Sequence, residues 1–356
     1  MNLQELLNTI RDNASSEYQA RIPEATRNNM EEIRYAMIDQ DNIMVANEFM
    51  STLLNKLVKT VVHTKMFNNP LKSLKKGNKP LGDGVEEIYT NFLKGDVYDS
   101  TGAELLKRNL PDTKTVYHRM NYKNQYTITV SREQLEKAFA SYDALESYIN
   151  NIIQTLYNSA ELDEFMNMKN LIKSALEKGA IKVVDIDDPL KEGAEEVNGK
   201  KFIKTVKTTS GLMVFPSTEY NGYLTAQTSD DKPITTFTRK DEQILMLDTP
   251  TDTSVNVDVL ASLFNMNVAE FNDTRKIVID VFPETTAGSV RGLLLDKDFF
   301  QIFDDLFTVT SWTNPKGLYT NYYLNVWQTL AFSILVNAVA FVVKEAEAEA
   351  EAEAGE

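Results

Sequence analysis

The sequence predicts a mixed α+β fold, and three of its features support this class. Between Pro111 and Gly179 the chain contains neither glycine nor proline, and apolar residues recur there at helical spacing. Residues 115–130 alternate with the two-residue period of a strand, and short β-prone runs separated by polar turns follow Gly179. With 356 residues the chain can bury a large core, as one elaborated domain or as two domains.

A single long helix is expected over residues 143–178. Leu145, Tyr148 and Ile152 begin an apolar repeat with helical spacing, and Gly179 is suited to end the helix because glycine tolerates the left-handed conformation found there. At 1.5 Å per residue this helix would be about 54 Å long, which matches the diameter of a compact chain of this size. The protein should therefore be flat or elongated along this helix.

The segments before this helix are predicted to be a helix, an irregular loop and a strand. Residues 46–62 have helical spacing, with one apolar face. Residues 68–82, NNPLKSLKKGNKPLG, place four lysines among two prolines and two glycines, which predicts an exposed, irregular excursion. Residues 115–130, TVYHRMNYKNQYTITV, predict a two-faced strand or one arm of a long hairpin.

The remaining chain is predicted to contain mainly strands and one helix, at 256–271. The β-prone runs lie at 180–186, 200–207, 212–216, 243–249, 275–282 and 290–296. The uncharged stretch 324–343 is long enough to cross a bilayer. Asn325, Gln328 and Asn337 interrupt it, and its Val, Ile, Phe and Trp content favours a buried core element over a membrane anchor. The acidic, low-complexity end of the chain, KEAEAEAEAEAGE, cannot bury a core and is expected to be solvated, whether it is native or an artificial extension.

Composition limits the classes of function. The chain has no cysteine, which excludes disulfides, a thiolate nucleophile and cysteine-ligated zinc, and favours synthesis in a reducing compartment. The formal net charge is −15, so nonspecific binding of nucleic acid over the whole surface is not expected. The first residues lack the basic and apolar regions of a secretory signal.

The chemistry-bearing residues do not converge on a catalytic site. His63 and His118 are far apart in sequence, and the phosphate-loop-like run 193–201 has the wrong spacing. Acidic pairs that could hold Mg²⁺ or act as general acids lie at 185–189, 230–231 and 304–305. Solvated turn carboxylates explain these pairs more simply. We therefore predict no catalytic residue, no cofactor, no metal and no enzyme activity, with a hydrolase using the aspartate pairs and a monomeric binding module as alternatives.

The lysines of segment 68–82 have three interpretations: a solvated loop, a DNA contact, or an arm that docks on the acidic body of another copy. DNA binding is disfavoured by the negative chain. We predict that Lys72, Lys75, Lys76 and Lys79 contact carboxylates of an adjacent subunit. Reversal of all four charges should then leave the monomer folded and suppress assembly.

Several blocks of the sequence resemble the major capsid proteins of phi-29-like podoviruses. The blocks are NNPLKSLKKGNKPLGDGVEEIYT, YNSAELDEFMNMK, DVLASLFNMN, LLDKDFFQIFDDL and NPKGLYTNYYLNVWQTLAFSILVNAVAFV. They run in order across residues 20–343, and residues 185–250 match poorly. The resemblance implies the Hong Kong 97-type capsid fold. The implied parts are an N-terminal arm (1–63), an extended loop (64–130), a peripheral domain with the spine helix (131–208 and 306–344), an axial domain (209–305) and the acidic tail (345–356).

The resemblance also implies a function. A protein of this family is a structural subunit that assembles as pentamers and hexamers into the icosahedral shell of the virion of a tailed bacteriophage. The implied partners are further copies of the chain, a scaffolding protein, a portal and the enclosed double-stranded DNA, which is held without sequence-specific binding. Synthesis in the bacterial host cytoplasm and no membrane contact are expected. Longer family members carry an immunoglobulin-like domain after the capsid fold, which is not expected here.

Overall fold

The computed structural model describes most of the chain. Its continuous stretches are residues 3–26, 67–98, 108–131, 142–223, 232–255 and 275–344, with single residues and short pieces between 29 and 137. The predicted helix 256–271, most of the predicted helix 46–62, His63, the acidic pair 230–231 and the tail 345–356 lie outside these described residues.

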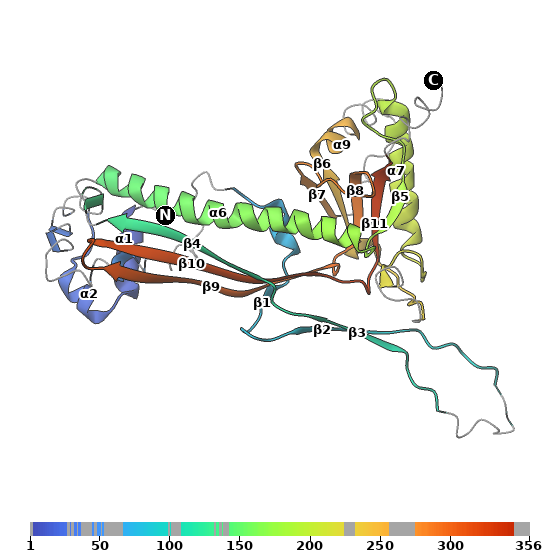
Figure 1. The fold of residues 1–356 in the computed structure, drawn as a ribbon, viewed down its shortest axis with the longest axis horizontal. Helices are drawn as coiled ribbons and strands as arrows, with labels where there is room; N and C mark the ends of the chain where they lie inside the picture. The colour runs from blue at the N-terminus through green and yellow to red at the C-terminus, as the bar shows by residue number, and fades with distance from the viewer. Residues whose placement is uncertain are drawn as a thin grey trace, which may run out of the picture.

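The long helix, α6 (Tyr142–Glu177), confirms the central expectation and runs along most of the elongated body in Figure 1. Gly179 follows it with φ of 70°, and the Ala180 N–H donates to the Ala175 carbonyl at 2.8 Å. This is the left-handed glycine ending that satisfies the last carbonyls of a helix. The glycine at this position therefore sets where the spine ends and the chain turns into the next sheet.

The other elements occupy both sides of α6 in the sequence. They are α1 (Leu3–Asn13), α2 (Ser16–Arg21), the 3₁₀ helix η2 (Pro70–Leu74), β1 (Gly77–Asn78), β2 (Val85–Thr90), β3 (Thr113–His118), β4 (Tyr122–Ser131), β5 (Lys182–Asp185), α7 (Glu195–Leu212), η3 (Lys240–Glu242), β6 (Gln243–Asp248), α9 (Thr249–Ser254), β7 (Arg275–Ile279), β8 (Ser289–Asp296), β9 (Phe300–Asn314), β10 (Tyr319–Phe332) and β11 (Ala338–Val343).

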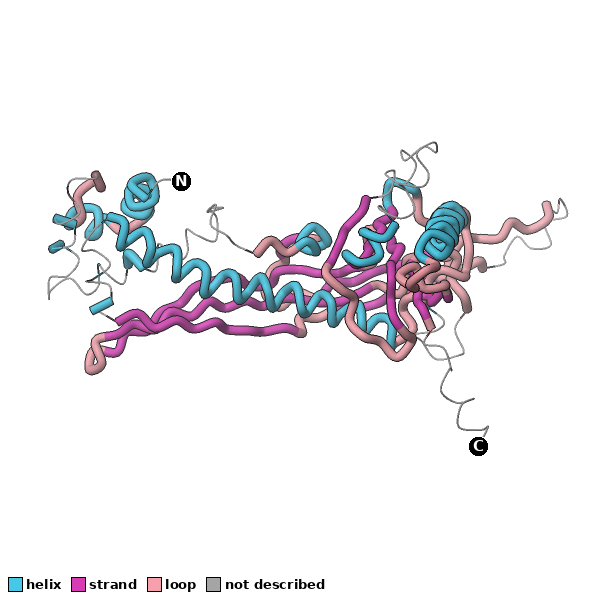
Figure 2. Tube along the Cα trace, turned by 90° about the horizontal axis from the view of Figure 1, so that it is seen from above, coloured by secondary structure: helices cyan, strands magenta, loops and turns pink. Residues whose placement is uncertain are grey.

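A four-stranded sheet of order β1-β9-β10-β4 lies beside α6 (Figures 1 and 2). β10 is central and pairs antiparallel with both β9 and β4. From Tyr319 to Gln328 its residues alternate in burial, with Tyr322, Leu324 and Val326 turned into a core that also contains residues of α1, α2 and the N-terminal half of α6. This alternation is what an antiparallel sheet with one solvated face requires.

A five-stranded mixed sheet of order β5-β11-β8-β6-β7 forms the other end of the molecule. The central strands β6 and β11 are buried along nearly their whole length, because both faces of the sheet are covered. α7 packs on one face through Phe202 and Val206, while the C-terminal half of α6 packs on the other through Met168 and Ile172. The spine helix therefore joins the two sheets through one continuous rigid element.

Several sequence-based assignments are wrong. Residues 200–207 were predicted as a strand but lie in α7, and residues 212–216 form the end of α7 and a turn. The stretch 115–130, predicted as one strand or one arm of a hairpin, is divided between two strands: β3 forms a hairpin with β2, and β4 joins the four-stranded sheet. The stretch 324–343 is a buried core element as expected, but it contributes to two sheets, through β10 and β11.

The packing of the sheets bears on where the expected domains meet, and the expected boundaries stay a prediction. α7 and β11 pack with the five-stranded sheet, and we propose that they belong to the axial domain together with the described residues between 182 and 299. Of the expected loop 64–130, the hairpin β2–β3 is the part that projects from the body (Figure 1), whereas β4 belongs to the four-stranded sheet. Among the helices of the described residues, none is long and apolar enough to cross a membrane.

Candidate subunit-contact site

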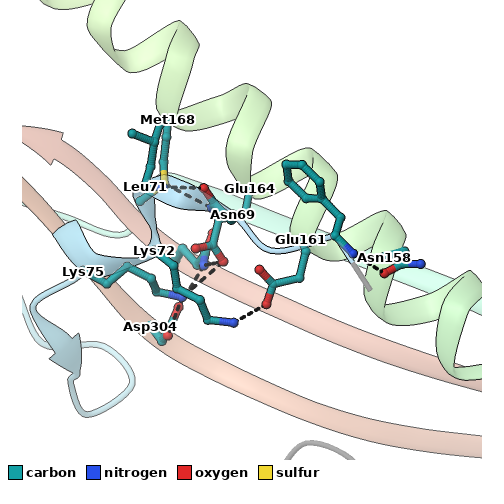
Figure 3. Close-up of polar contacts among 11 residues, drawn as sticks. Asn69, Leu71, Lys72, Lys75, Asn158, Glu161, Glu164, Met168 and Asp304 are labelled. Atoms are coloured by element: carbon teal, nitrogen blue, oxygen red, sulfur yellow. Dashed lines mark hydrogen bonds and ion pairs between the residues drawn. The ribbon is translucent and has the colours of Figure 1, made fainter. Parts of the chain in front are cut away.

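The lysine-bearing segment 67–80 is anchored on the body by its apolar residues. Asn69 precedes η2, and its side-chain oxygen accepts from the Leu71 N–H at 2.9 Å while its amide donates to Met168 Sδ at 3.5 Å. Leu71 and Leu74 are 0% and 5% exposed and join the core between α6 and the five-stranded sheet. A helix cap and two buried leucines therefore hold this segment against the spine helix (Figure 3).

Lys75 lies between two carboxylates from different elements. Its Nζ is 3.1 Å from Glu164 Oε2 of α6 and 2.7 Å from Asp304 Oδ2 of β9 (Figure 3). Gln328 of β10 donates to both carboxylates, at 3.0 Å and 2.8 Å. Burial alone would lower the pKa of Lys75, but the charges of Glu164 and Asp304 and their hydrogen bonds to its ammonium outweigh burial and raise the pKa above its ordinary value.

The other three lysines also have carboxylate partners within the same chain. Lys72 pairs with Glu161 of α6, and Lys76 pairs with Asp298 just before β9. Lys79 Nζ lies 3.0 Å from Asp305 Oδ1, and both of these side chains are almost fully buried. The second oxygen of Asp305 accepts from the Thr329 hydroxyl at 2.8 Å. We call Lys72, Lys75, Lys76 and Lys79 with these carboxylates the lysine clamp.

All four clamp lysines have carboxylate partners within their own chain, and the predicted contact with carboxylates of an adjacent subunit stays a prediction. The segment stays on the body of its own chain, because Leu71 and Leu74 are buried in the core. The carboxylates that pair with Lys75 belong to α6 and β9 of the same chain. The side chains of Lys75 and Lys79 are only 13% and 8% exposed in the single chain. Lys72, whose side chain is 54% exposed, is the clamp lysine with most surface left, and its contact with a neighbour stays a prediction.

The projecting element is the hairpin β2–β3, which we call the arm together with its described extensions 91–98 and 108–112. Its ladder runs from Val85 opposite His118 to Thr90 opposite Thr113. Before it, Gly82 has φ of 94°, a turn conformation that favours glycine. The arm is braced on the body at the far end of this ladder, where the Asn91 amide donates to the Pro233 carbonyl at 3.0 Å and its oxygen accepts from the Thr235 N–H at 3.1 Å.

Beyond this brace the arm exposes large apolar side chains. Leu93, Val97, Tyr98 and Leu110 are 73%, 96%, 90% and 81% exposed. Scattered exposed apolar residues are ordinary, but a projecting element that carries several of them in a row is typical of a surface that another chain covers. The arm lies within the expected extended loop 64–130, but local sequence did not single out residues 91–112, because they lack the regular alternation of a strand.

The residues that were candidates for catalysis have structural partners. His118 Nε2 lies 2.9 Å from Glu87 Oε2 across the arm ladder. Asp187 and Asp188 pair with Lys201 and Arg291, and the pair 304–305 belongs to the lysine clamp. The run 193–201 opens α7. In the described stretches no three His, Cys, Asp or Glu side chains gather closely enough to hold a metal ion.

The fold is that of the subunits of phage capsid shells. The chain is similar to the solved capsid structure of Staphylococcus phage Andhra, with a TM-score of 0.64 and 12% sequence identity, over 80% of this chain and 87% of that chain. It is also similar to the capsid structure of the Cyanophage P-SCSP1u, with a TM-score of 0.53 and 10% identity, over 81% of this chain and 91% of that one. The long helix beside a sheet, the projecting arm and the second sheet domain form the Hong Kong 97-type arrangement.

Sequence comparison gives the family. The profile of the Phi29-like phage major capsid protein matches residues 7–342. The chain is 35% identical over 344 residues to the major capsid protein of Bacillus phage PZA, covering 95% of this chain and 72% of that protein. It is 27% identical over 360 residues to that of Streptococcus phage Cp-1, covering 96% and 94%. The chain belongs to the Phi29-like phage major capsid protein family, as the resemblance predicted.

Proposed function

We propose that copies of this chain assemble as pentamers and hexamers into the icosahedral head shell of a tailed phage and enclose its double-stranded DNA. The observation that carries the proposal is the arm. It is a braced hairpin on which Leu93, Val97 and Tyr98 are exposed to solvent, and such a surface is typical of one that a neighbouring subunit covers. Membership in a major capsid protein family supports the same function. The arm of one subunit would lie on the next, and the contact would repeat around the shell.

The lysine clamp supports this function from within the subunit. It joins segment 67–80 to α6 and β9, next to the root of the arm at Gly82. A rigid root fixes the direction in which the arm leaves the body, so less freedom is lost when the arm docks. In this proposal the clamp positions the arm, and the exposed apolar residues of the arm make the contact.

The shell would enclose DNA without gripping it. The chain carries a formal net charge of −15, so its average interaction with phosphate is repulsive, which suits a wall past which DNA must move during packaging and release. A scaffolding protein and a portal are expected partners in assembly, and synthesis in the bacterial host cytoplasm is expected. No catalytic role is proposed. Asp187, Asp188 and Asp304, which are among the acidic residues that a hydrolase could have used, are held in ion pairs.

Co-expression tests the proposal. The chain would be produced alone and with the scaffolding protein of the same phage, and the products would be separated by sedimentation and viewed by electron microscopy. Closed shells of uniform diameter are expected, at least in the co-expressed sample. A chain that stays monomeric in both samples, with intact folding by circular dichroism, would contradict the proposal.

A further inference from the structure

The solvent face of α7 carries a row of lysines. Lys200, Lys204 and Lys207 have i, i+4 and i+7 spacing, which places them within an arc of about 60° around the helix. The buried residues Phe202 and Val206 lie on the other side, against the five-stranded sheet. All three lysines are exposed, and α7 lies at the end of the molecule away from α1 and α2 (Figure 1). We call these three lysines the lysine ridge.

The ridge belongs to a stretch of sequence without acidic residues. Residues 197–218 contain four lysines and neither aspartate nor glutamate, in a chain whose formal net charge is −15. Like charges three or four residues apart on a helix repel one another and destabilise it. The repetition of lysine therefore works against the stability of α7, which favours a role of the ridge in binding.

The ion pairs of α7 leave this charge available to a partner. Lys200 pairs with Glu196, and these side chains are 43% and 54% exposed. Lys201, on the flank of the ridge, pairs with Asp187 at 2.7 Å, and both side chains are more than half exposed. Ion pairs at such exposed positions contribute little to stability, so their lysines can turn to another anion. Within the described residues, Lys204 has no ion-pair partner.

A groove of about 590 Å³ adjoins the ridge and adds hydroxyl groups to it. Thr205 and Thr208 of α7 line this groove. Thr205 donates to the Lys201 carbonyl, whereas the Thr208 hydroxyl has no hydrogen-bond partner within the described residues. The lining also carries three lysines and two aspartates, and both aspartates are paired with lysines of the lining. The flank of the ridge is therefore not negative, and it offers a hydroxyl donor beside the lysines.

We propose that the lysine ridge contacts the phosphate backbone of double-stranded DNA, and that α7 therefore faces the inside of the shell. The inference rests on the proposed function, in which the shell encloses DNA. The ridge is about 10 Å long, and over this length a DNA duplex presents about six phosphates. Lysine and threonine side chains are groups that contact phosphate oxygens without reading the base sequence.

The surface of the ridge favours DNA over an acidic protein segment. In residues 200–207 every exposed side chain is a lysine. A protein interface combines charge with an apolar core, which this surface does not offer, whereas a phosphate backbone requires only charges and hydroxyl groups. The contact would be local and sensitive to salt, because the net charge of −15 repels DNA from the rest of the chain. The wall would therefore order the nearest DNA without gripping it.

Binding of unassembled full-length subunits to a short DNA duplex of mixed sequence tests the ridge. Fluorescence anisotropy of the labelled duplex is measured from low to moderate salt. The ridge variant carries Lys200→Gln, Lys204→Gln and Lys207→Gln. The control variant has the same net charge and loses three exposed lysines of other segments, by Lys94→Gln, Lys232→Gln and Lys316→Gln. Circular dichroism checks that both variants keep the native helix content.

At low salt the ridge variant should bind the duplex at least about tenfold more weakly than the native chain, and the control should stay close to it. The slope of log affinity against log salt should fall in magnitude by about 3 in the ridge variant, about one for each lysine lost. No binding by the native chain at low salt, or equal losses in the two variants, would overturn the proposal. Displacement of the duplex by an equal charge of polyglutamate would also overturn it, in favour of an acidic protein partner.

Electron microscopy of the same proteins separates this inference from the proposed function. The native chain and both variants should form closed shells under the same conditions, because the ridge is assigned to DNA and not to a neighbouring subunit. Shells from all three proteins with equal DNA binding would overturn the ridge contact and leave the shell function supported. A native chain that binds DNA through the ridge but never forms shells would contradict the proposed function instead.

Discussion

Lys75 Nζ lies 2.7 Å from Asp304 Oδ2, and this contact joins the segment that leads into the arm to the strand β9, far along the chain. Glu164 of α6 lies on the other side of the same ammonium, at 3.1 Å. One lysine therefore fastens three parts of the subunit together: the segment before the arm, the spine helix and the four-stranded sheet. The predictions below follow from this arrangement and from the arm that it supports.

Loss of Lys75 should destabilise the subunit far more than loss of Lys72. Lys75→Met leaves Glu164 and Asp304 close together and without their cation, which should lower the free energy of unfolding by about 3–5 kcal/mol. Lys72→Met removes a pair whose lysine is 54% exposed, and should cost about 0–1 kcal/mol. Urea unfolding of the two variants measures the difference. Equal costs would show that the buried pair does not stabilise the arm root.

Reversal of all four clamp lysines to glutamate should now prevent stable folding, in contrast to the expectation from sequence. The new carboxylates would face Glu161, Glu164 and Asp305 in the same chain, at partly or fully buried positions. The variant is expected to unfold at lower urea concentration than Lys75→Met, as measured by circular dichroism. A quadruple variant that folds normally but fails to assemble would instead support the prediction that these lysines contact an adjacent subunit.

The clamp should also make stability sensitive to alkaline pH. Glu164 and Asp304 raise the pKa of Lys75 above its ordinary value of 10.5, so its stabilising contribution is fully present below that pH and is lost as pH rises through the folded-state pKa. The free energy of unfolding of the native chain should therefore fall more steeply above pH 10.5 than that of Lys75→Met. Parallel curves for the two proteins would contradict this assignment.

Substitutions in the spine helix should lower the free energy of unfolding where the helix packs on the five-stranded sheet. Ile172 is 0% exposed and packs in the core shared by α6 and the five-stranded sheet. Ile172→Ala should cost about 2–5 kcal/mol, and the matched control Ile172→Val about 0.5–1.5 kcal/mol. Thermal unfolding measures both. A cost below 1 kcal/mol for the alanine variant would mean that the helix does not depend on this core.

The arm should be dispensable for folding and required for assembly. Leu93→Asp with Tyr98→Asp changes two side chains that are 73% and 90% exposed, so the free energy of unfolding should stay within about 0.5 kcal/mol of the native value. Loss of apolar anchors typically weakens a contact by about 1–2 kcal/mol each, and the loss repeats in every subunit. Sedimentation should show few or no shells, whereas the arm control Lys94→Ser should assemble.

The long helix could be predicted to within a residue at each end because its signal is long and its stop is a glycine. α7 could not be predicted, because the run 200–207 contains too few apolar residues to distinguish the period of a helix from that of a strand. Its buried residues, Asn198, Phe202, Val206 and Thr209, reveal the helical repeat over a longer window and include polar residues. Considered alone, the short run 200–207 therefore favoured a strand.

The lysine segment shows a different limit of sequence reasoning. Its prolines, glycines and lysines correctly indicated irregular structure, but Leu71 and Leu74, three residues apart after the cap Asn69, were the signal that it is anchored. The carboxylate partners lie about 90 and 220–230 positions further along the chain. Nothing in local sequence pairs such distant residues, so own-chain and neighbouring-chain partners could not be distinguished before the fold was known.

A reconstruction of assembled shells by electron cryomicroscopy tests the central claim most directly. The account predicts closed shells in which the arm of each subunit, with Leu93, Val97 and Tyr98, lies buried on a neighbouring subunit, while Lys75 stays paired with Glu164 and Asp304 of its own chain. Shells in which the arm remains exposed to solvent, or in which Lys75 pairs across the subunit boundary, would contradict it.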